Sequence, residues 1–120
     1  MMSEAQMKST AKLMRNVCQP KTKVTNAQIE DMHKGIFDDD SKAQCYMLCV
    51  LQMMKAMKNG KLDYEYALSA VSTLAPRYQE PTRVTLDNCK ESVQSTDHCE
   101  GGYQLAKCMY FSNPEFYFLP

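Results

Sequence analysis

The stretch CYMLCVLQMMKAM, residues 45–57, places two cysteines four positions apart and follows them with three methionines. On an α-helix, residues i and i+4 project from the same face, so Cys45 and Cys49 point together toward whatever packs there. A bond between these two thiols fits poorly with intact helical geometry and would leave the other cysteine-bearing segments unlinked. We therefore expect Cys45 and Cys49 to bond to two different segments, with their helix at the centre of the fold.

The whole chain has 120 residues and six cysteines, with no tryptophan and only four glycines. This composition favours a helical, disulfide-stabilised module of the secreted, extracellular type. Zinc-binding thiols are the alternative, but the chain has no C-x2-C pair and neither histidine has a partner at zinc-finger spacing. We expect no metal site, no cofactor and six disulfide-bonded cysteines, namely Cys18, Cys45, Cys49, Cys89, Cys99 and Cys108. From the residues alone, fifteen pairings stay open.

Charge and hydropathy exclude several classes of protein. The 14 basic and 14 acidic residues form no long block of either sign, so nucleic acid is not an expected partner. No apolar run approaches the roughly 20 residues that span a bilayer. The first residues lack the continuous apolar segment of a secretory signal, so a secreted protein would be seen here in its mature form. Residues 1–120 are predicted to form one soluble domain.

Apolar residues recur at helical spacing along most of the chain, and no segment has a convincing strand pattern. The predicted helices are Ser3 to Val17, stopped by Gln19 and Pro20; Asn26 to Lys34; Lys42 to Lys58, stopped by Asn59 and Gly60; Tyr64 to Leu74, stopped by Pro76; a fifth starting at Pro81, with Val84, Cys89 and Val93 buried; and a sixth holding Tyr103 to Met109, with a break at Gly101 and Gly102. Thr25 and Gln28 are a predicted capping box. The acidic run 38–40 is expected to cap the third helix, because it lacks the alternating ligands of a calcium loop. The fold class is therefore all-α.

The cysteines follow the pattern C-x26-C-x3-C-x39-C-x9-C-x8-C. This spacing, above all its x3 and x8 gaps, resembles that of the six-cysteine insect odorant-binding proteins, the general-odorant and pheromone-binding family, over nearly the whole chain. The resemblance implies a compact bundle of about six helices around an apolar cavity. It also implies three interlocked disulfides, Cys18–Cys49, Cys45–Cys99 and Cys89–Cys108. The implied function is an extracellular, non-enzymatic carrier that binds a small hydrophobic or amphipathic ligand, such as an odorant or pheromone, and delivers it to a sensory receptor.

The resemblance also implies a set of ligand-binding residues, carried over position by position. They are Met7, Thr10, Ala11, Met14, Leu51, Met54, Leu62, Leu74, Leu86, Met109 and Leu119. Where relatives that sense short alcohols carry polar residues, this chain has Met47, Leu51 and Ala56, which favours a larger or more apolar ligand. A methionine-rich wall adapts to several ligand shapes because the side chain is flexible and polarizable. Ordinary core packing is the alternative role for any single methionine.

Residues 110–120 form an aromatic tail with too much apolar area to remain in water. We expect this tail to dock near the cavity and close it, with the carboxylate of Pro120 near the surface. Thr10, Tyr103 and Tyr110 are candidates for orienting the ligand through a hydrogen bond. His33 and His98 are candidates for coupling ligand release to acidification near a membrane, through looser tail contacts, although ordinary surface roles are the alternative.

The main alternative function is a saposin-like helical module that interacts with lipids or membranes. Such modules also use six cysteines but place paired cysteines near both ends, whereas the closest pair here is central. A nucleophilic hydrolase is disfavoured because the chain has two isolated histidines and no G-x-S-x-G motif. The expected partners are thus a small hydrophobic ligand and a sensory receptor or membrane, and a homodimer is compatible with the sequence.

Overall fold

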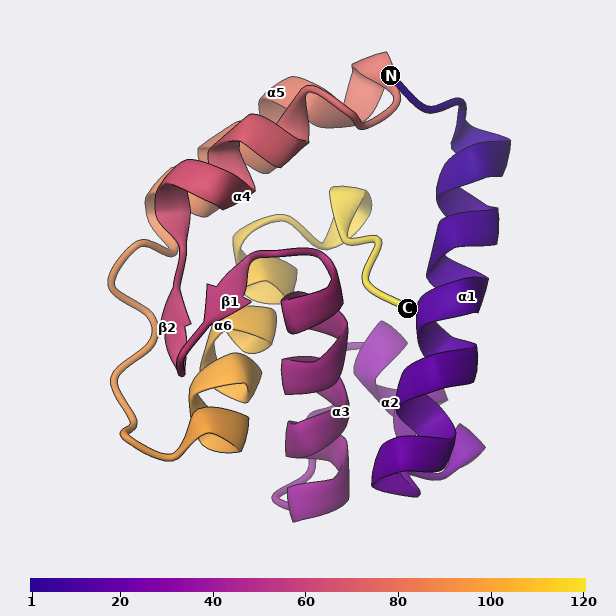
Figure 1. Cartoon of the computed structure of the whole chain (residues 1–120), viewed down its shortest axis with the longest axis vertical. Helices are drawn as coiled ribbons and strands as arrows, with labels where there is room; N and C mark the ends of the chain where they lie inside the picture. Colours follow the sequence, from indigo (N-terminus) through magenta and orange to yellow (C-terminus); the bar gives the residue numbers. More distant parts are fainter.

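The computed structural model describes residues 1–120 and consists mainly of helices (Figure 1). The elements are α1 (Glu4–Thr22), α2 (Asn26–His33), α3 (Ser41–Met53), β1 (Met57–Lys58), β2 (Lys61–Leu62), α4 (Tyr64–Val71), α5 (Pro76–Asn88), α6 (His98–Ser112) and the short 3₁₀ helix η1 (Pro114–Phe116). The six α-helices confirm the predicted all-α class. None of them combines the length and the apolar character that a membrane span needs.

The centre of the fold is α3, as the opening cysteine pair predicted. This helix packs most extensively against α6 and next against α1. Its buried side chains are Ala43, Tyr46, Met47, Cys49, Val50 and Leu51. Gly102 of α6 allows the two helices to approach closely, because a Cβ atom at this position would lie 2.8 Å from the Cα of Leu48. The expected chain break at this glycine was therefore wrong, since α6 runs straight through it.

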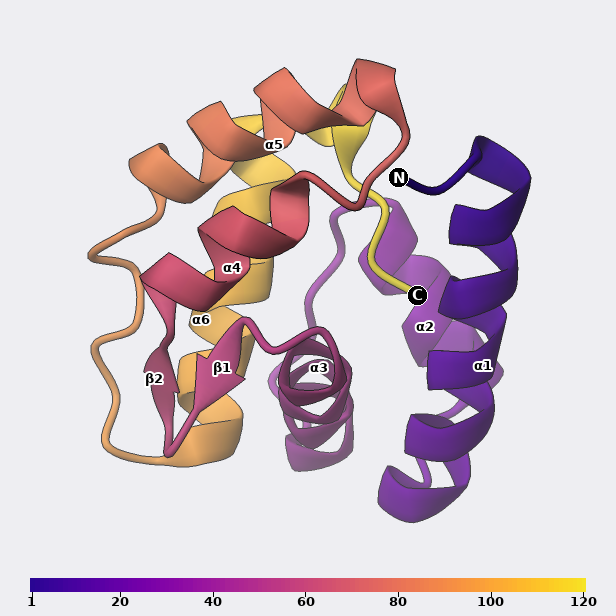
Figure 2. The ribbon, with the colours of Figure 1, turned by 45° about the horizontal axis from the view of Figure 1, so that its top comes forward.

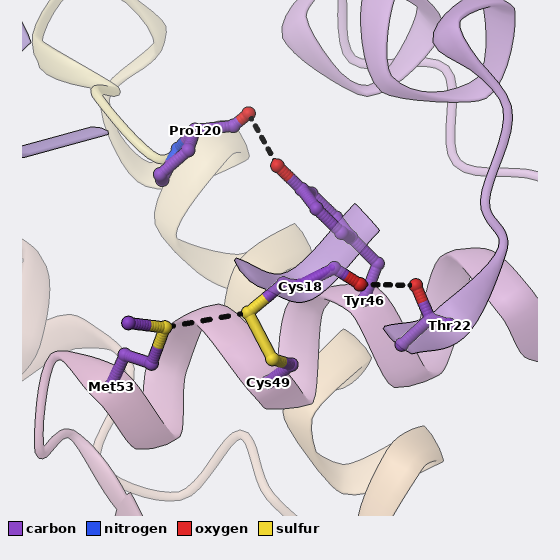
Figure 3. The surroundings of a disulfide bond; sticks show 6 residues. All are labelled: Cys18, Thr22, Tyr46, Cys49, Met53 and Pro120. Atoms are coloured by element: carbon purple, nitrogen blue, oxygen red, sulfur yellow. Dashed lines mark hydrogen bonds between the residues drawn. A yellow bond between two sulfur atoms is a disulfide. The ribbon is translucent and has the colours of Figure 1, made fainter. Parts of the chain in front are cut away.

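Three disulfides tie the helices to one another. Cys18–Cys49 joins α1 to α3 (Figure 3), Cys45–Cys99 joins α3 to α6, and Cys89–Cys108 joins the residue that follows α5 to α6. These pairs confirm the interlocked pattern that the family resemblance implied. In the chain-entropy model each bridge contributes roughly 2–4 kcal/mol, not additively, because it restricts the unfolded chain.

The first helix extends past its predicted stop and ends at Thr22. Pro20 lies inside the last turn, where it removes one backbone hydrogen bond, yet the helix continues for two residues beyond it. The Thr22 hydroxyl donates a hydrogen bond to the carbonyl oxygen of Cys18 over 2.8 Å. The Lys23 N–H donates to the Gln19 carbonyl oxygen over 2.8 Å, and Lys23 has a φ of 64°, which ends the helix. Both capping boxes, Ser3 with Gln6 and the predicted Thr25 with Gln28, are present.

The third helix ends at Met53 and not at Lys58, because a hairpin follows it. Lys55, Asn59 and Gly60 have φ values of 63°, 53° and 76°, which a right-handed helix does not accommodate. In the hairpin, Met57 of β1 pairs with Leu62 of β2. Asn-Gly is the preferred sequence for a two-residue hairpin turn with positive φ at both positions. The dipeptide that we interpreted as a helix stop is therefore a hairpin turn.

The region between the fourth and fifth helices also differs from the prediction. α4 ends at Val71 and α5 begins at Pro76, where proline occupies the first helical position. A proline there loses only a donor that has no helical partner, so Pro76 starts a helix and does not merely stop one. Val84, expected inside, is exposed on α5, and the buried residues of that helix are Thr82, Thr85 and Leu86.

The last residues turn back across the bundle and end beside α1 (Figures 1 and 2). Leu119 and Pro120 are buried. The Tyr46 hydroxyl donates to the Pro120 carbonyl oxygen over 3.1 Å (Figure 3), and the Nε2 of His33 lies 2.9 Å from the same oxygen. Because that oxygen only accepts, Nε2 must carry the proton. Pro120 is thus an interior residue, which corrects the expectation that it lies near the surface.

Candidate ligand-binding cavity

An apolar cavity of about 220 Å³, here called the outer chamber, lies between α1 and the α4–α5 connection. Figures 1 and 2 show α1 on one side, α4 and α5 on the other, and the tail between them. The wall of the outer chamber consists of Met2, Met7, Thr10, Ala11, Met14, Met54, Ala70, Thr73, Leu74, Phe118 and Pro120. Because no charged side chain lines it, an apolar molecule suits it best.

A smaller apolar space of about 50 Å³, the inner chamber, adjoins the outer one. The two chambers share Met54, Ala70, Leu74 and Phe118, which form the boundary between them. The other residues of the inner wall are Leu51, Ala56, Ala67, Val71, Thr82, Leu86 and Met109. These residues come from α3, the following loop and α4 to α6, so one apolar path leads from α1 into the core.

Local sequence explains why methionines line the outer chamber. Met7, Ala11 and Met14 recur at three- and four-residue steps, which puts them in one stripe on α1. Met54 follows the last residue of α3, and the positive φ of Lys55 turns the chain there. Met54 therefore lies at the boundary between the chambers. If α3 had continued, the chain would not have turned at this point.

The structure brings together nine of the eleven residues in the predicted ligand set. Met7, Thr10, Ala11, Met14, Met54 and Leu74 line the outer chamber, while Leu51, Leu86 and Met109 line the inner one. Leu62 and Leu119 line neither chamber. Leu62 on β2 packs against the core, and Leu119 is part of the core itself. A role in ligand binding remains a prediction for the whole set.

Sequence reasoning missed several residues of the two walls. They are Met2, Ala67, Ala70, Val71, Thr73, Thr82, Phe118 and Pro120. Ala67, Ala70 and Val71 recur at helical spacing on α4, so their periodicity was a usable signal. The aromatic composition of the tail predicted docking but did not single out Phe118. Thr82 gave no signal, because a polar residue on a helix is ordinarily assigned to the solvent-facing side.

Of the three candidates for a polar contact with the ligand, only Thr10 lines a chamber. The Thr10 hydroxyl lies 3.6 Å from the sulfur of Met2. The Tyr103 hydroxyl donates to the Asp38 carbonyl oxygen over 2.8 Å, and burial raises the pKa of Tyr103. Tyr110 stacks edge-on against Phe37 in an aromatic cluster. Tyr103 and Tyr110 therefore hold the core together outside the cavity.

The two histidines occupy different environments. The His33 ring contacts the tail through Pro120, as described above, although the residue as a whole is exposed. The His98 ring lies against Gly60 in the hairpin turn and lines neither chamber. Any influence of histidine on the tail would therefore act through His33. Burial raises the pKa of its neighbour Tyr46 to about 12, so this hydroxyl stays protonated and able to donate.

Comparisons with known proteins agree with this architecture. The model of the PBP/GOBP family matches residues 1–112. General odorant-binding protein 72 of Anopheles gambiae is 36% identical over 118 residues, which cover 97% of this chain and 98% of that protein.

Solved structures give the same result. Odorant binding protein 4 of Chrysopa pallens superposes with a TM-score of 0.97 at 55% identity, over 100% of both chains. Odorant binding protein 5 of Apis mellifera superposes with a TM-score of 0.91 at 30% identity, over 99% of this chain and 98% of that one. Because the family match and these superpositions span nearly the whole sequence, the chain belongs to the PBP/GOBP family, a family of small-ligand carriers and not of enzymes.

Proposed function

We propose that this protein is an extracellular carrier that shields a small hydrophobic or amphipathic molecule, such as an odorant, and delivers it to a sensory receptor. The observation that carries the proposal is the pair of apolar chambers, which the chain's own tail helps to enclose through Phe118 and Pro120. The three disulfides support an extracellular location, because such bonds persist in oxidising compartments.

The size of the chambers points to a small ligand. The outer chamber, at about 220 Å³, lies below the roughly 300–1,000 Å³ of pockets that hold drug-sized molecules. The apolar walls agree with the expectation of an apolar ligand. The volume, however, favours a smaller ligand than the sequence suggested. Affinity would come mainly from burial of apolar ligand surface, at about 25 cal/mol per Å².

The tail would have to move for a ligand to enter or leave. The sequence suggested that protonation of histidine loosens the tail, but the contact favours the opposite effect. His33 already donates from Nε2 to the Pro120 oxygen, and a protonated ring keeps that donor while adding positive charge. We therefore propose that mild acidification retains or strengthens the tail contact.

Native mass spectrometry of the oxidised protein against a panel of odorants and lipids tests the carrier function. The expected result is a single bound ligand of low mass for each protein chain. The same spectra would report the oligomeric state, including a homodimer. Vesicle leakage without saturable ligand binding would instead favour the saposin-like alternative and contradict the carrier.

A further inference from the structure

Thr82 carries a buried hydroxyl that has no hydrogen-bond partner in the protein. Its Oγ1 is the only buried side-chain polar atom in this state. The residue lies on α5, is 6% exposed, and lines the inner chamber. All other residues of that chamber's wall are apolar, namely Leu51, Met54, Ala56, Ala67, Ala70, Val71, Leu74, Leu86, Met109 and Phe118.

This hydroxyl lacks the local hydrogen bond that Thr22 and Thr73 make. Thr22 donates to the carbonyl oxygen of Cys18, four residues earlier in α1. Thr73, on the wall of the outer chamber, donates to the Ala70 carbonyl oxygen over 2.7 Å. A threonine in a helix commonly makes such a local bond, and Thr82 makes none. A valine would fill the same space without leaving a polar group unpaired, so the hydroxyl is unfavourable in the empty protein.

The side chains of the two chambers limit which chemical group of a ligand can hydrogen-bond to this hydroxyl. No lysine, arginine, histidine, aspartate or glutamate lines either chamber. An ionised carboxylate on the ligand would therefore be buried without a cationic side chain to pair with it, at high cost. A neutral oxygen pays no such penalty, and a hydroxyl both donates and accepts. An alcohol, an aldehyde or a ketone can thus pair with Thr82, whereas an ionised fatty acid cannot be neutralised there.

We propose that Thr82 is the residue that orients the ligand and that the ligand is a neutral apolar molecule with one terminal or near-terminal oxygen. This oxygen enters the inner chamber and hydrogen-bonds to Thr82. The apolar remainder extends past Met54 and Phe118 to the methionines of α1 in the outer chamber. The inference rests on the proposed carrier function and adds the class of ligand and its direction in the cavity.

The test uses two ligands with equal numbers of heavy atoms, decanol and undecane, which compete with the fluorescent probe N-phenyl-1-naphthylamine. Four proteins are compared: wild type, Thr82→Val, Thr82→Ser and Thr85→Val. Valine keeps the shape of threonine but removes the hydroxyl, and serine keeps the hydroxyl. Thr85 is an equally buried threonine on α5 that lines neither chamber, although it shares a separate space of only about 10 Å³ with Thr82. It therefore controls for the loss of a hydroxyl next to the chambers but not in them.

We expect Thr82→Val to weaken decanol binding about fivefold to tenfold and to leave undecane binding within about twofold. Thr82→Ser and Thr85→Val should keep the wild-type ratio between the two ligands. Thr82→Val should also raise the melting temperature of the empty protein, because it removes an unpaired buried hydroxyl. If the Thr82 hydroxyl instead stabilised the fold, Thr82→Val would lower the melting temperature.

The possible failures are distinguishable. If both ligands displace the probe but Thr82→Val changes their affinities equally or not at all, the assignment of Thr82 is wrong and the carrier function stands. The hydroxyl would then hold at most a water molecule. If neither ligand, nor any other compound of the mass-spectrometry panel, binds to wild type, both the carrier function and the role of Thr82 are wrong.

Discussion

The Tyr46 hydroxyl donates a hydrogen bond over 3.1 Å to the carbonyl oxygen of Pro120, 74 positions later in the chain. This bond connects the central helix α3 to the segment that helps enclose the cavity (Figure 3). Tyr46 has no exposed surface, so its hydroxyl has no solvent to exchange with. The position of the tail is thus set from inside the core.

Replacing Tyr46 with phenylalanine should loosen the tail without disturbing the disulfides. The variant leaves the Pro120 oxygen with His33 alone, and we expect a loss of about 1 kcal/mol in the free energy of unfolding. Hydrogen exchange at the amides of residues 117–119 should accelerate more than exchange in α3. Tyr103→Phe is the matched control, because its hydroxyl bonds to Asp38 and not to the tail. Equal exchange rates in both variants would show that the Tyr46 bond does not hold the tail.

Alkaline pH should destabilise the protein through its buried tyrosines. Burial raises the pKa of Tyr46 from about 10 to about 12, and the pKa values of Tyr103 and Tyr117 are raised as well. Above about pH 10 the unfolded chain loses these protons first, so the free energy of unfolding falls as the pH rises toward 12. The stabilisation is fully present below pH 10.

Urea unfolding from about pH 8 to about pH 11 measures this effect. Tyr46→Phe should give a shallower decline than wild type, because one of the shifted groups is gone.

On the acidic side, probe affinity in mildly acidic buffer should equal or exceed that at neutral pH, since a protonated His33 keeps its bond to Pro120. Ligand release on mild acidification would contradict this reading of the contact.

Gly102 should be intolerant of any side chain. A Cβ atom there would lie 2.8 Å from the backbone Cα of Leu48, so Gly102→Ala must push α3 and α6 apart, at a cost of about 1–3 kcal/mol. Gly101→Ala is the control, because its Cβ would lie 3.1 Å from a side-chain methyl of Val93 and no closer than 3.6 Å to any backbone atom of another segment. Alanine at that position gains helix propensity. Thermal unfolding of both variants measures the difference. Equal melting temperatures would contradict the close approach of α3 and α6 at Gly102.

The elements that were predictable from the sequence are those fixed by local pattern. The methionine stripe of α1 depends only on helical spacing, and the disulfide pairing followed from cysteine spacing through a family resemblance. Asn59 and Gly60 were ambiguous, because the same dipeptide ends helices and turns hairpins, and only the packing of the following strand decides between them. Pro76 was ambiguous in the same way, since proline both follows helices and starts them.

The cavity was less predictable, because it depends on segments that are distant in the sequence. Phe118 joins the wall only because the tail returns to α1, and Leu119 next to it enters the core instead. Thr82 is polar, so a rule that assigns polar residues to the surface places it outside. Contacts of this kind are set by tertiary packing, which local periodicity does not describe.

The most direct test of the central claim is an NMR titration of isotope-labelled methionine methyl groups with decanol. Met7, Met14 and Met54 line the outer chamber, whereas Met32 and Met57 are buried elsewhere in the core. The account predicts saturable shifts at the first three methionines and unchanged signals at the other two. Shifts at Met32 and Met57, or no saturable shift at any methionine of the chamber, would contradict a ligand-carrying cavity in this position.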